Sequence, residues 1–258
     1  MTVTARTLRR WSVLALLIAA TLSLAGLTAA PKSYAADDSQ IYVIQGLPGR
    51  SVDISIDDKI VGRGIGTAKV AGPFTVKAGT RKVTYSDGGK VLLERVWKVR
   101  PGISQDVILH QPGTSDNNPM ITVFTNDLSA VPKGKAALTV AHTARVGEAD
   151  VRVDNKVLFA DIANGQSLNL VVPVQTYKVA IVPAGKPDPV VLGPVTLTVK
   201  GGALNRVYAI GDPSQKTMNV AVHVIDVAST GSGRPKWVKT GTGGQAAALQ
   251  PSGPALWS

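Results

Sequence analysis

Two stretches of eleven residues, SVDISIDDKIV at 51–61 and EADVRVDNKVL at 148–158, decide the fold. In the first stretch the apolar residues Val52, Ile54 and Ile56 alternate with polar ones, and the second stretch repeats this alternation. Successive side chains of a strand point to opposite faces of a sheet. The alternation therefore predicts a strand with one buried face and one solvated face, written twice in the chain.

Each stretch also contains a polar pair between two apolar runs, Asp57-Asp58 in the first and Asp154-Asn155 in the second. A tight hairpin needs central residues that tolerate positive φ, and Asp and Asn do so more easily than other residues with a side chain. The two pairs therefore predict hairpin turns.

The similarity extends far beyond these stretches, at an offset of 97 residues that aligns Asp53 with Asp150. With one-residue slips, VKAGTRKV at 76–83 matches VPVQTYKV at 172–179. The sequence therefore predicts two homologous units of about 95 residues, a usual size for a small domain. The same offset also aligns Ile41 with Leu138, Val43 with Val140, Ile56 with Val153, Lys59 with Lys156 and Ile65 with Ile162.

The composition favours strands over helices, because Val, Ile, Leu and Ala dominate the apolar residues and the 26 glycines and 16 prolines supply frequent turns. Seven or eight short strands per unit indicate an all-β protein with two tandem immunoglobulin-like antiparallel β-sandwich domains. Besides the strand in 51–61, the expected strands of the first unit are 41–45, 59–63, 73–77, 81–86, 91–99, 105–110 and 120–125.

The N-terminal segment has the features of a secretory signal peptide. Three arginines precede an uncharged stretch at 11–30, and Ser33 and Ala35 place small residues where a signal peptidase reads. We expect cleavage after Ala35 and export of the mature chain. The alternative is an uncleaved anchor, because about 20 apolar residues can span a bilayer.

These features divide the chain into four parts: a signal peptide at 1–35, sandwiches at 36–131 and 132–228, and a flexible Gly/Ser/Pro/Ala-rich tail at 229–258. The short linker DLSAVPKGK at 127–135 predicts limited motion between the sandwiches. The chain has no cysteine, so an exported form gains no stability from disulfides.

The net charge of +11 is concentrated at the two ends of the chain. Seven cations without a compensating acid lie before Tyr34 or after Asp226, which leaves +4 for the body of the protein. A nucleic-acid partner needs basic residues gathered on one surface, with aromatic side chains for stacking on single strands. We therefore expect no nucleic-acid partner.

Catalytic and metal-binding motifs do not emerge from the sequence. The histidines His110, His142 and His223 stand far apart, without the spacing of a metal site, and no nucleophile elbow is present. We expect no catalytic residue, no metal site and no cofactor. A calcium site at the neighbouring Asp53, Asp57 and Asp58 stays open as an alternative.

The order of several motifs resembles secreted proteins of Gram-positive bacteria that carry the domain of unknown function DUF4397. The resemblance rests on IYVIQGLPGRSVDISIDDKIV, GPFTVKAGTRKV, ITVFTND, VPKGKAALTVAHTARVGEADVRVDNKVLF, VYAIGD and GTGGQAA, and it covers most of the chain after the signal segment. It implies an exported β-sandwich, and it brings no established catalytic residue to transfer.

The sequence departs from that family at two places. A histidine commonly begins the first loop motif, where this chain has Gln45, whereas His142 occupies the equivalent place in the second unit. Glycine is common at the hairpin positions of Asp58 and Asn155. The loop GLPGR at 46–50 is a turn by composition, and it is also a candidate ligand-facing loop. The candidate ligand-binding residues are therefore Gln45, Pro48, Arg50 and His142.

The leading functional hypothesis is a secreted or cell-envelope-associated, non-catalytic β-sandwich protein that binds an envelope polymer or an extracellular protein. Two alternatives stay open. One is a hydrolase of envelope polysaccharide with an Asp-based site, for which Asp53 and Asp150 are the candidates, and the other is a calcium-stabilised adhesin.

Overall fold

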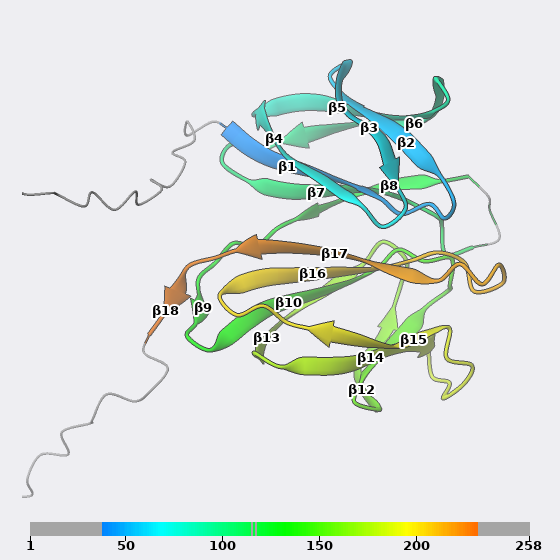
Figure 1. Ribbon diagram of the computed structural model, residues 1–258, viewed down its shortest axis with the longest axis vertical. Coiled ribbons are helices and arrows are strands. Elements are labelled where there is room, and N and C mark those ends of the chain that lie inside the picture. Colours follow the sequence, from blue (N-terminus) through cyan, green and yellow to red (C-terminus); the bar gives the residue numbers. More distant parts are fainter. Residues whose placement is uncertain (1–37, 115, 117, 232–258) are drawn as a thin grey trace, which may run out of the picture. The chain divides into compact units, whose positions relative to one another are not determined.

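The computed structural model describes residues 38–114, 116 and 118–231, and the regular elements in them are strands (Figure 1). These residues belong to one compact unit. The predicted signal segment, its cleavage site after Ala35 and most of the predicted tail lie outside the described residues. In the part of the chain that the structure describes, no helix has the length and hydropathy to cross a membrane.

The first half of the described chain forms a sandwich of two four-stranded sheets. The strand order is β4-β1-β7-β8 in one sheet and β3-β2-β5-β6 in the other. Their bounds are β1 (Asp38–Gln45), β2 (Ser51–Ile56), β3 (Lys59–Gly66), β4 (Val70–Lys77), β5 (Gly79–Asp87), β6 (Lys90–Val99), β7 (Ser104–His110) and β8 (Met120–Thr125).

The second half repeats this topology. Its sheets have the orders β13-β10-β16-β17 and β12-β11-β14-β15, which correspond strand by strand to those of the first half. A short parallel pair of β9 and β18 accompanies them. The bounds are β9 (Val131–Pro132), β10 (Lys135–His142), β11 (Ala149–Val153), β12 (Lys156–Ile162), β13 (Ser167–Pro173), β14 (Thr176–Pro183), β15 (Leu192–Thr198), β16 (Ala203–Ile210), β17 (Asn219–Asp226) and β18 (Ser229–Thr230).

The prediction of an all-β sandwich is confirmed. Val52, Ile54 and Ile56 of β2 are buried, whereas the intervening residues are exposed or half-buried. The turn residues Asp57 and Asp58 have φ of 48° and 63°. Asp154 and Asn155 of the second hairpin have φ of 49° and 65°. Turn chemistry therefore explains both polar pairs. The predicted domain boundaries stay a prediction.

Each sandwich encloses its own core. In the first, aliphatic side chains from both sheets surround Tyr85 and Trp97, and the indole of Trp97 donates to Gln105 at 3.1 Å. In the second, the core is built almost entirely from Val, Leu, Ile and Ala, with Tyr177 as its buried aromatic. The two cores share no residue. Each sandwich therefore buries an apolar centre of its own.

One ladder in each sandwich departs from the expected antiparallel pairing. β1 pairs with β7 in parallel, and β10 pairs with β16 in the same way. The other pairs within the two sandwiches are antiparallel. Alternation of side chains cannot distinguish parallel from antiparallel pairing, so these two ladders could not be predicted from it. Because the paired strands run in the same direction, the C-terminal ends of β1 and β7 lie side by side, as do those of β10 and β16.

The strands β7 and β16 are buried along their whole length, on both faces. One face of each strand serves the core of its own sandwich. On the other face Ile108 of β7 and Tyr208 and Ile210 of β16 join a third apolar cluster, which also takes in Ile44, Phe124, Ala141 and Ala221. Side chains of both sandwiches make up this cluster, so the two sandwiches bury a shared interface.

A polar network lies within this interface, centred on the fully buried Asp106 of β7. Its carboxylate accepts hydrogen bonds from the Tyr208 hydroxyl at 2.6 Å, from His223 Nδ1 at 2.9 Å and from Asn126 Nδ2 at 2.7 Å. Arg206, 2% exposed, places Nε 4.0 Å from the same carboxylate. Tyr208, Arg206 and His223 belong to the second sandwich, so the network crosses the interface.

Candidate functional site

Gln45, the first candidate from the sequence, ends β1 and is fully buried. Its side-chain oxygen accepts a hydrogen bond from the backbone N–H of Leu47 at 2.9 Å, and its side-chain nitrogen donates to the carbonyl of Arg50 at 3.2 Å. Gln45 therefore closes the loop 46–50 from beneath. It positions Pro48 and Arg50 at the surface and is not itself accessible to a ligand.

His142 has the same place in the second sandwich, at the end of β10, and is 2% exposed. Its Nε2 lies 2.8 Å from the carbonyl of Gly147 and 3.1 Å from that of Val146, in the loop that follows β10. Burial lowers the pKa of its imidazole. Gln45 and His142 therefore have one task, because each holds the loop that follows the first strand of its sandwich.

The loops after β1, β7, β10 and β16 meet at one end of the compact unit, and we name this surface the loop pole (residues 46–50, 111–114, 116, 118–119, 143–148 and 211–218). Contacts join its loops across the interface: Arg145 Nε donates to the carbonyl of Thr114 at 3.2 Å, and Asn164, which precedes β13, donates to that of Gln111 at 3.2 Å. The loops of the two sandwiches therefore hold each other in place.

A pocket of about 400 Å³ opens at the loop pole. Both sandwiches contribute to it, and its wall combines aliphatic and proline surfaces with guanidinium and carboxamide groups. Two of the four candidates from the sequence line it, while the other two, Gln45 and His142, lie beneath its loops. The lining residues are Leu47, Pro48, Arg50, Leu92, Gln111, Pro119, Arg145 and Gln215.

The two arginines of the pocket are held by aspartates. Arg50 Nη1 lies 3.0 Å from Asp87 Oδ2, and its side chain is 51% exposed. Arg145 Nη1 lies 3.5 Å from Asp212 Oδ2 and is far less exposed, at 16%. Guanidinium groups favour carboxylates and phosphates, since their N–H groups match those anions in geometry. The sequence pointed to Arg50, whereas Arg145 was missed because its partner loop lies in the other sandwich.

The remaining histidines are structural in their contacts. His110 is fully buried, with Nε2 2.8 Å from the Thr122 hydroxyl and Nδ1 2.8 Å from the carbonyl of Gln111. Burial, with a smaller effect of the nearby His142, lowers the pKa of His110 to about 4. His223 is bound to Asp106 in the interface. All three histidines therefore support loops or the interface.

The aspartates suggested for calcium are each engaged by a group of the first sandwich. Asp53 accepts the N–H of Gly64 at 2.8 Å, Asp57 accepts that of Lys82 at 2.9 Å, and Asp58 lies 2.6 Å from Lys82 Nζ. The described residues contain no group of three or more His, Cys, Asp or Glu side chains that could hold a metal ion. These three carboxylates therefore stabilise turns and strands of the first sandwich.

Asp150, the second carboxylate of the hydrolase alternative, is 5% exposed. Its oxygens accept the N–H groups of Asp161 and Gly185, both at 3.0 Å. Asp53 and Asp150 occupy equivalent positions in the two sandwiches, and each accepts a backbone N–H from the neighbouring hairpin strand. Both carboxylates therefore fasten the hairpin beside them.

Comparison with known proteins adds one match. Residues 39–152, which run from β1 to β11, match the family model described as domain of unknown function DUF4397. No curated protein matches the chain. The resemblance noted in the sequence is confirmed over those residues, which are similar to the DUF4397 family model.

Proposed function

We propose that this chain is an exported, non-catalytic binding module of the cell envelope, and that the loop pole is the surface that binds. The observation that carries this proposal is the pocket lined by loops of both sandwiches, with Arg50 and Arg145 in its wall. Export rests on the signal-like segment at 1–35. A non-catalytic role is supported by the contacts of three buried groups: His142 and Asp150 bond backbone groups, and His223 bonds Asp106.

The ligand class follows from the chemistry of the pocket. Two guanidinium groups select an anion, and the carboxamides of Gln111 and Gln215 suit hydroxyl or amide groups. Leu47 and Pro48 supply apolar surface beside them. An anionic glycopolymer of the envelope presents this combination of acidic groups, hydroxyls and apolar ring faces. We therefore favour such a polymer over an extracellular protein.

The test is co-sedimentation of the mature chain with purified cell walls that retain or lack their anionic polymers. We expect binding to the intact walls, about tenfold weaker binding after polymer removal, and a decline with added salt because exposed charge pairs are screened. Arg50→Ala removes one cation of the pocket. Arg63→Ala is the matched control, because Arg63 is also an exposed arginine paired with an aspartate, at 3.4 Å from Asp53, and lies outside the pocket.

Equal binding of the Arg50→Ala and Arg63→Ala variants would contradict the assignment of the loop pole. Binding that survives polymer removal but disappears after protease treatment of the walls would favour a protein partner. For export, mass spectrometry of the released chain should give a new N-terminus at residue 36, and an intact residue 1 would support the uncleaved anchor.

A further inference from the structure

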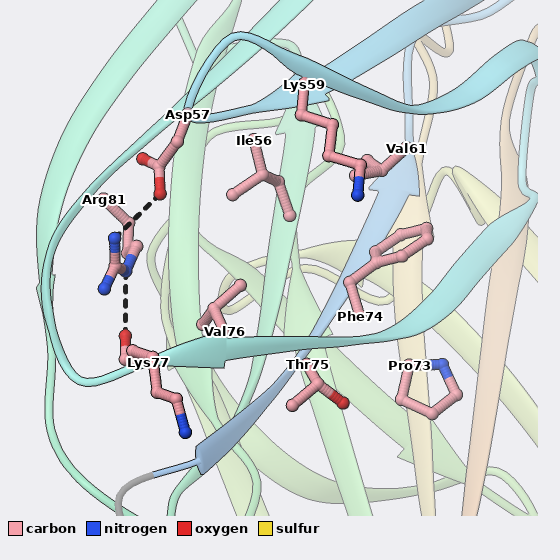
Figure 2. Close-up of a pocket in the computed structure, with 10 residues that line it drawn as sticks. All are labelled: Ile56, Asp57, Lys59, Val61, Pro73, Phe74, Thr75, Val76, Lys77 and Arg81. Atoms are coloured by element: carbon pink, nitrogen blue, oxygen red, sulfur yellow. Dashed lines mark hydrogen bonds and ion pairs between the residues drawn. The ribbon is translucent and has the colours of Figure 1, made fainter.

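A second, independent hollow lies at one edge of the first sandwich, between β3 and β4, and has a volume of about 510 Å³. We name it the edge groove. Its floor is apolar, formed by Ile56, Val61, Phe74 and Val76 (Figure 2). β3 and β4 are the edge strands of their sheets, so no further strand covers the floor. Val61, Phe74 and Val76 pack against the core and still remain partly exposed.

Cations surround this floor. Lys59, Lys77 and Arg81 line the groove together with a single carboxylate, Asp57. Figure 2 shows Lys59 reaching from β3 toward the side of β4 that carries Phe74, while Arg81 and Asp57 face each other at the other end. Among the described residues Lys59 makes no ion pair, whereas Lys77 is paired with Asp38 at 2.5 Å. The groove thus joins an apolar floor to a net positive rim.

The second sandwich provides an internal comparison. Register places Tyr177 opposite Leu197, as Arg81 stands opposite Trp97, so Tyr177 is the counterpart of Arg81. Arg81 Nε donates to the carbonyl of Lys77 at 2.8 Å, and the Tyr177 hydroxyl donates to the carbonyl of Pro173 at 2.9 Å. Lys77 and Pro173 are themselves counterparts, because they pair with Asp38 and Lys135 at the starts of β1 and β10.

The two sandwiches therefore fulfil the same structural requirement with different side chains. Tyr177 is 8% exposed and belongs to the core of the second sandwich, where Val172 is 9% exposed. Val76, the counterpart of Val172 in the first sandwich, remains partly exposed. The backbone carbonyl does not need a guanidinium, since a tyrosine serves it equally. The positive charge and the open floor are thus properties of the first sandwich that its fold does not demand.

We propose that the edge groove binds the acyl chain and acidic head group of a single-chain amphiphile, such as a fatty acid. The acyl chain lies on the floor between Phe74 and Ile56, where it removes apolar surface from water. The head group lies against Lys59, the rim cation without an ion pair among the described residues.

The positive charge of the rim favours an acidic amphiphile over a segment of this chain as the occupant of the edge groove. The C-terminal segment 232–258 contains Arg234, Lys236 and Lys239 and no acidic residue, so it matches the positive rim poorly. An acidic amphiphile complements both the floor and the rim, and it is the occupant that the lining supports.

The test is isothermal titration calorimetry of the mature chain with dodecanoate below its critical micelle concentration. Dodecyl maltoside supplies the same chain length with a neutral head, and acetate supplies the head without the chain. We expect saturable binding of dodecanoate at a ratio of one, about tenfold weaker binding of dodecyl maltoside, and none of acetate. Lys59→Gln should weaken the binding of dodecanoate by about tenfold. Lys156→Gln changes the counterpart of Lys59 in the second sandwich and should leave this binding unchanged.

Arg81→Tyr transfers the residue of the second sandwich into the first and should abolish binding while the melting temperature is kept. Lys59 is exposed, so Lys59→Gln remains informative even if Arg81→Tyr unfolds the protein. The proposal is wrong if dodecanoate does not bind, or if it binds equally to the wild type and to Lys59→Gln. Equal affinity for dodecyl maltoside would overturn the role of the cations, and dimerisation that competes with dodecanoate would assign the groove to a second copy of the chain.

Discussion

The hydroxyl of Tyr208 in the second sandwich donates a hydrogen bond of 2.6 Å to the carboxylate of Asp106 in the first, and neither side chain is exposed to solvent. Burial, together with the charge of Asp106, raises the pKa of Tyr208 well above its usual value, so the hydroxyl stays protonated as a donor. Because the bond joins residues 102 positions apart, it fixes one sandwich against the other.

Substitution in this network is expected to destabilise the whole compact unit. Tyr208→Phe removes a hydrogen bond to a buried charge, which costs about 1.5–3 kcal/mol. Asp106→Ala leaves the buried Arg206 without its carboxylate and should cost about 3–5 kcal/mol. Urea unfolding followed by circular dichroism measures both. Asp226→Ala is the control, because Asp226 forms an exposed pair with Lys200 and should change stability by less than about 1 kcal/mol.

Stability should fall on acidification because of His110. Its folded pKa is about 4, whereas the unfolded imidazole titrates near 6.5, so the unfolded chain binds a proton first as the pH falls. The stabilisation is complete above pH 6.5 and is lost progressively toward pH 4, by about 3 kcal/mol in all. Urea midpoints measured from pH 7.5 to 4 test this. A His110→Gln variant should show a shallower decline, and an equal decline would exclude His110 as its source.

Gln45 and His142 should be interchangeable to a large extent. Gln45→Ala leaves the N–H of Leu47 and the carbonyl of Arg50 without their partner and should cost about 1–3 kcal/mol. Gln45→His places in the first sandwich the residue that holds the loop of the second, so we expect a smaller loss, below about 1 kcal/mol. Thermal unfolding compares the two variants. Equal losses would mean that the two loops need different side chains.

Asp150 and Asp53 should differ in their contribution to stability although they are counterparts. Asp150→Ala removes an acceptor of two backbone N–H groups at a buried position and should cost about 2–3 kcal/mol. Asp53 is more exposed, with 36% of its side chain accessible, so Asp53→Ala should cost about 1 kcal/mol or less. Chemical unfolding measures both. Loss of a polysaccharide hydrolysis activity in Asp53→Ala at unchanged stability would instead support the hydrolase alternative.

Much of the sandwich could be read from local pattern. The alternation in SVDISI gave β2, and the Asp-Asp and Asp-Asn pairs gave the hairpins, because strand pleat and turn φ are decided by neighbouring residues. The 97-residue offset aligned elements that prove topologically equivalent, such as β1 and β10.

The interface could not be read in this way. Asp106 and His110 are polar residues on alternate positions of β7, and both are fully buried. The surface that covers Asp106 comes from Tyr208 and His223, more than 100 residues later, and no local pattern records such a partner. The candidate site shared this difficulty, because its pocket needs Arg145 and Gln215 from the second sandwich beside Pro48 from the first.

The parallel ladder between β1 and β7 has a consequence for the order in which the chain acquires its structure. Ile41 of β1 pairs with Gln105 of β7, so β1 lacks this neighbouring strand until more than sixty further residues have been synthesised. Pairing across such a separation carries a loop-closure cost and slows folding. The face of β7 that bears Asp106 then stays uncovered until β16 and β17 have formed. A product truncated before β16 would therefore present the Asp106 carboxylate, without its partners Tyr208 and His223, and the apolar Ile44 and Phe124 to its surroundings. We expect such a product to be less soluble than the complete chain.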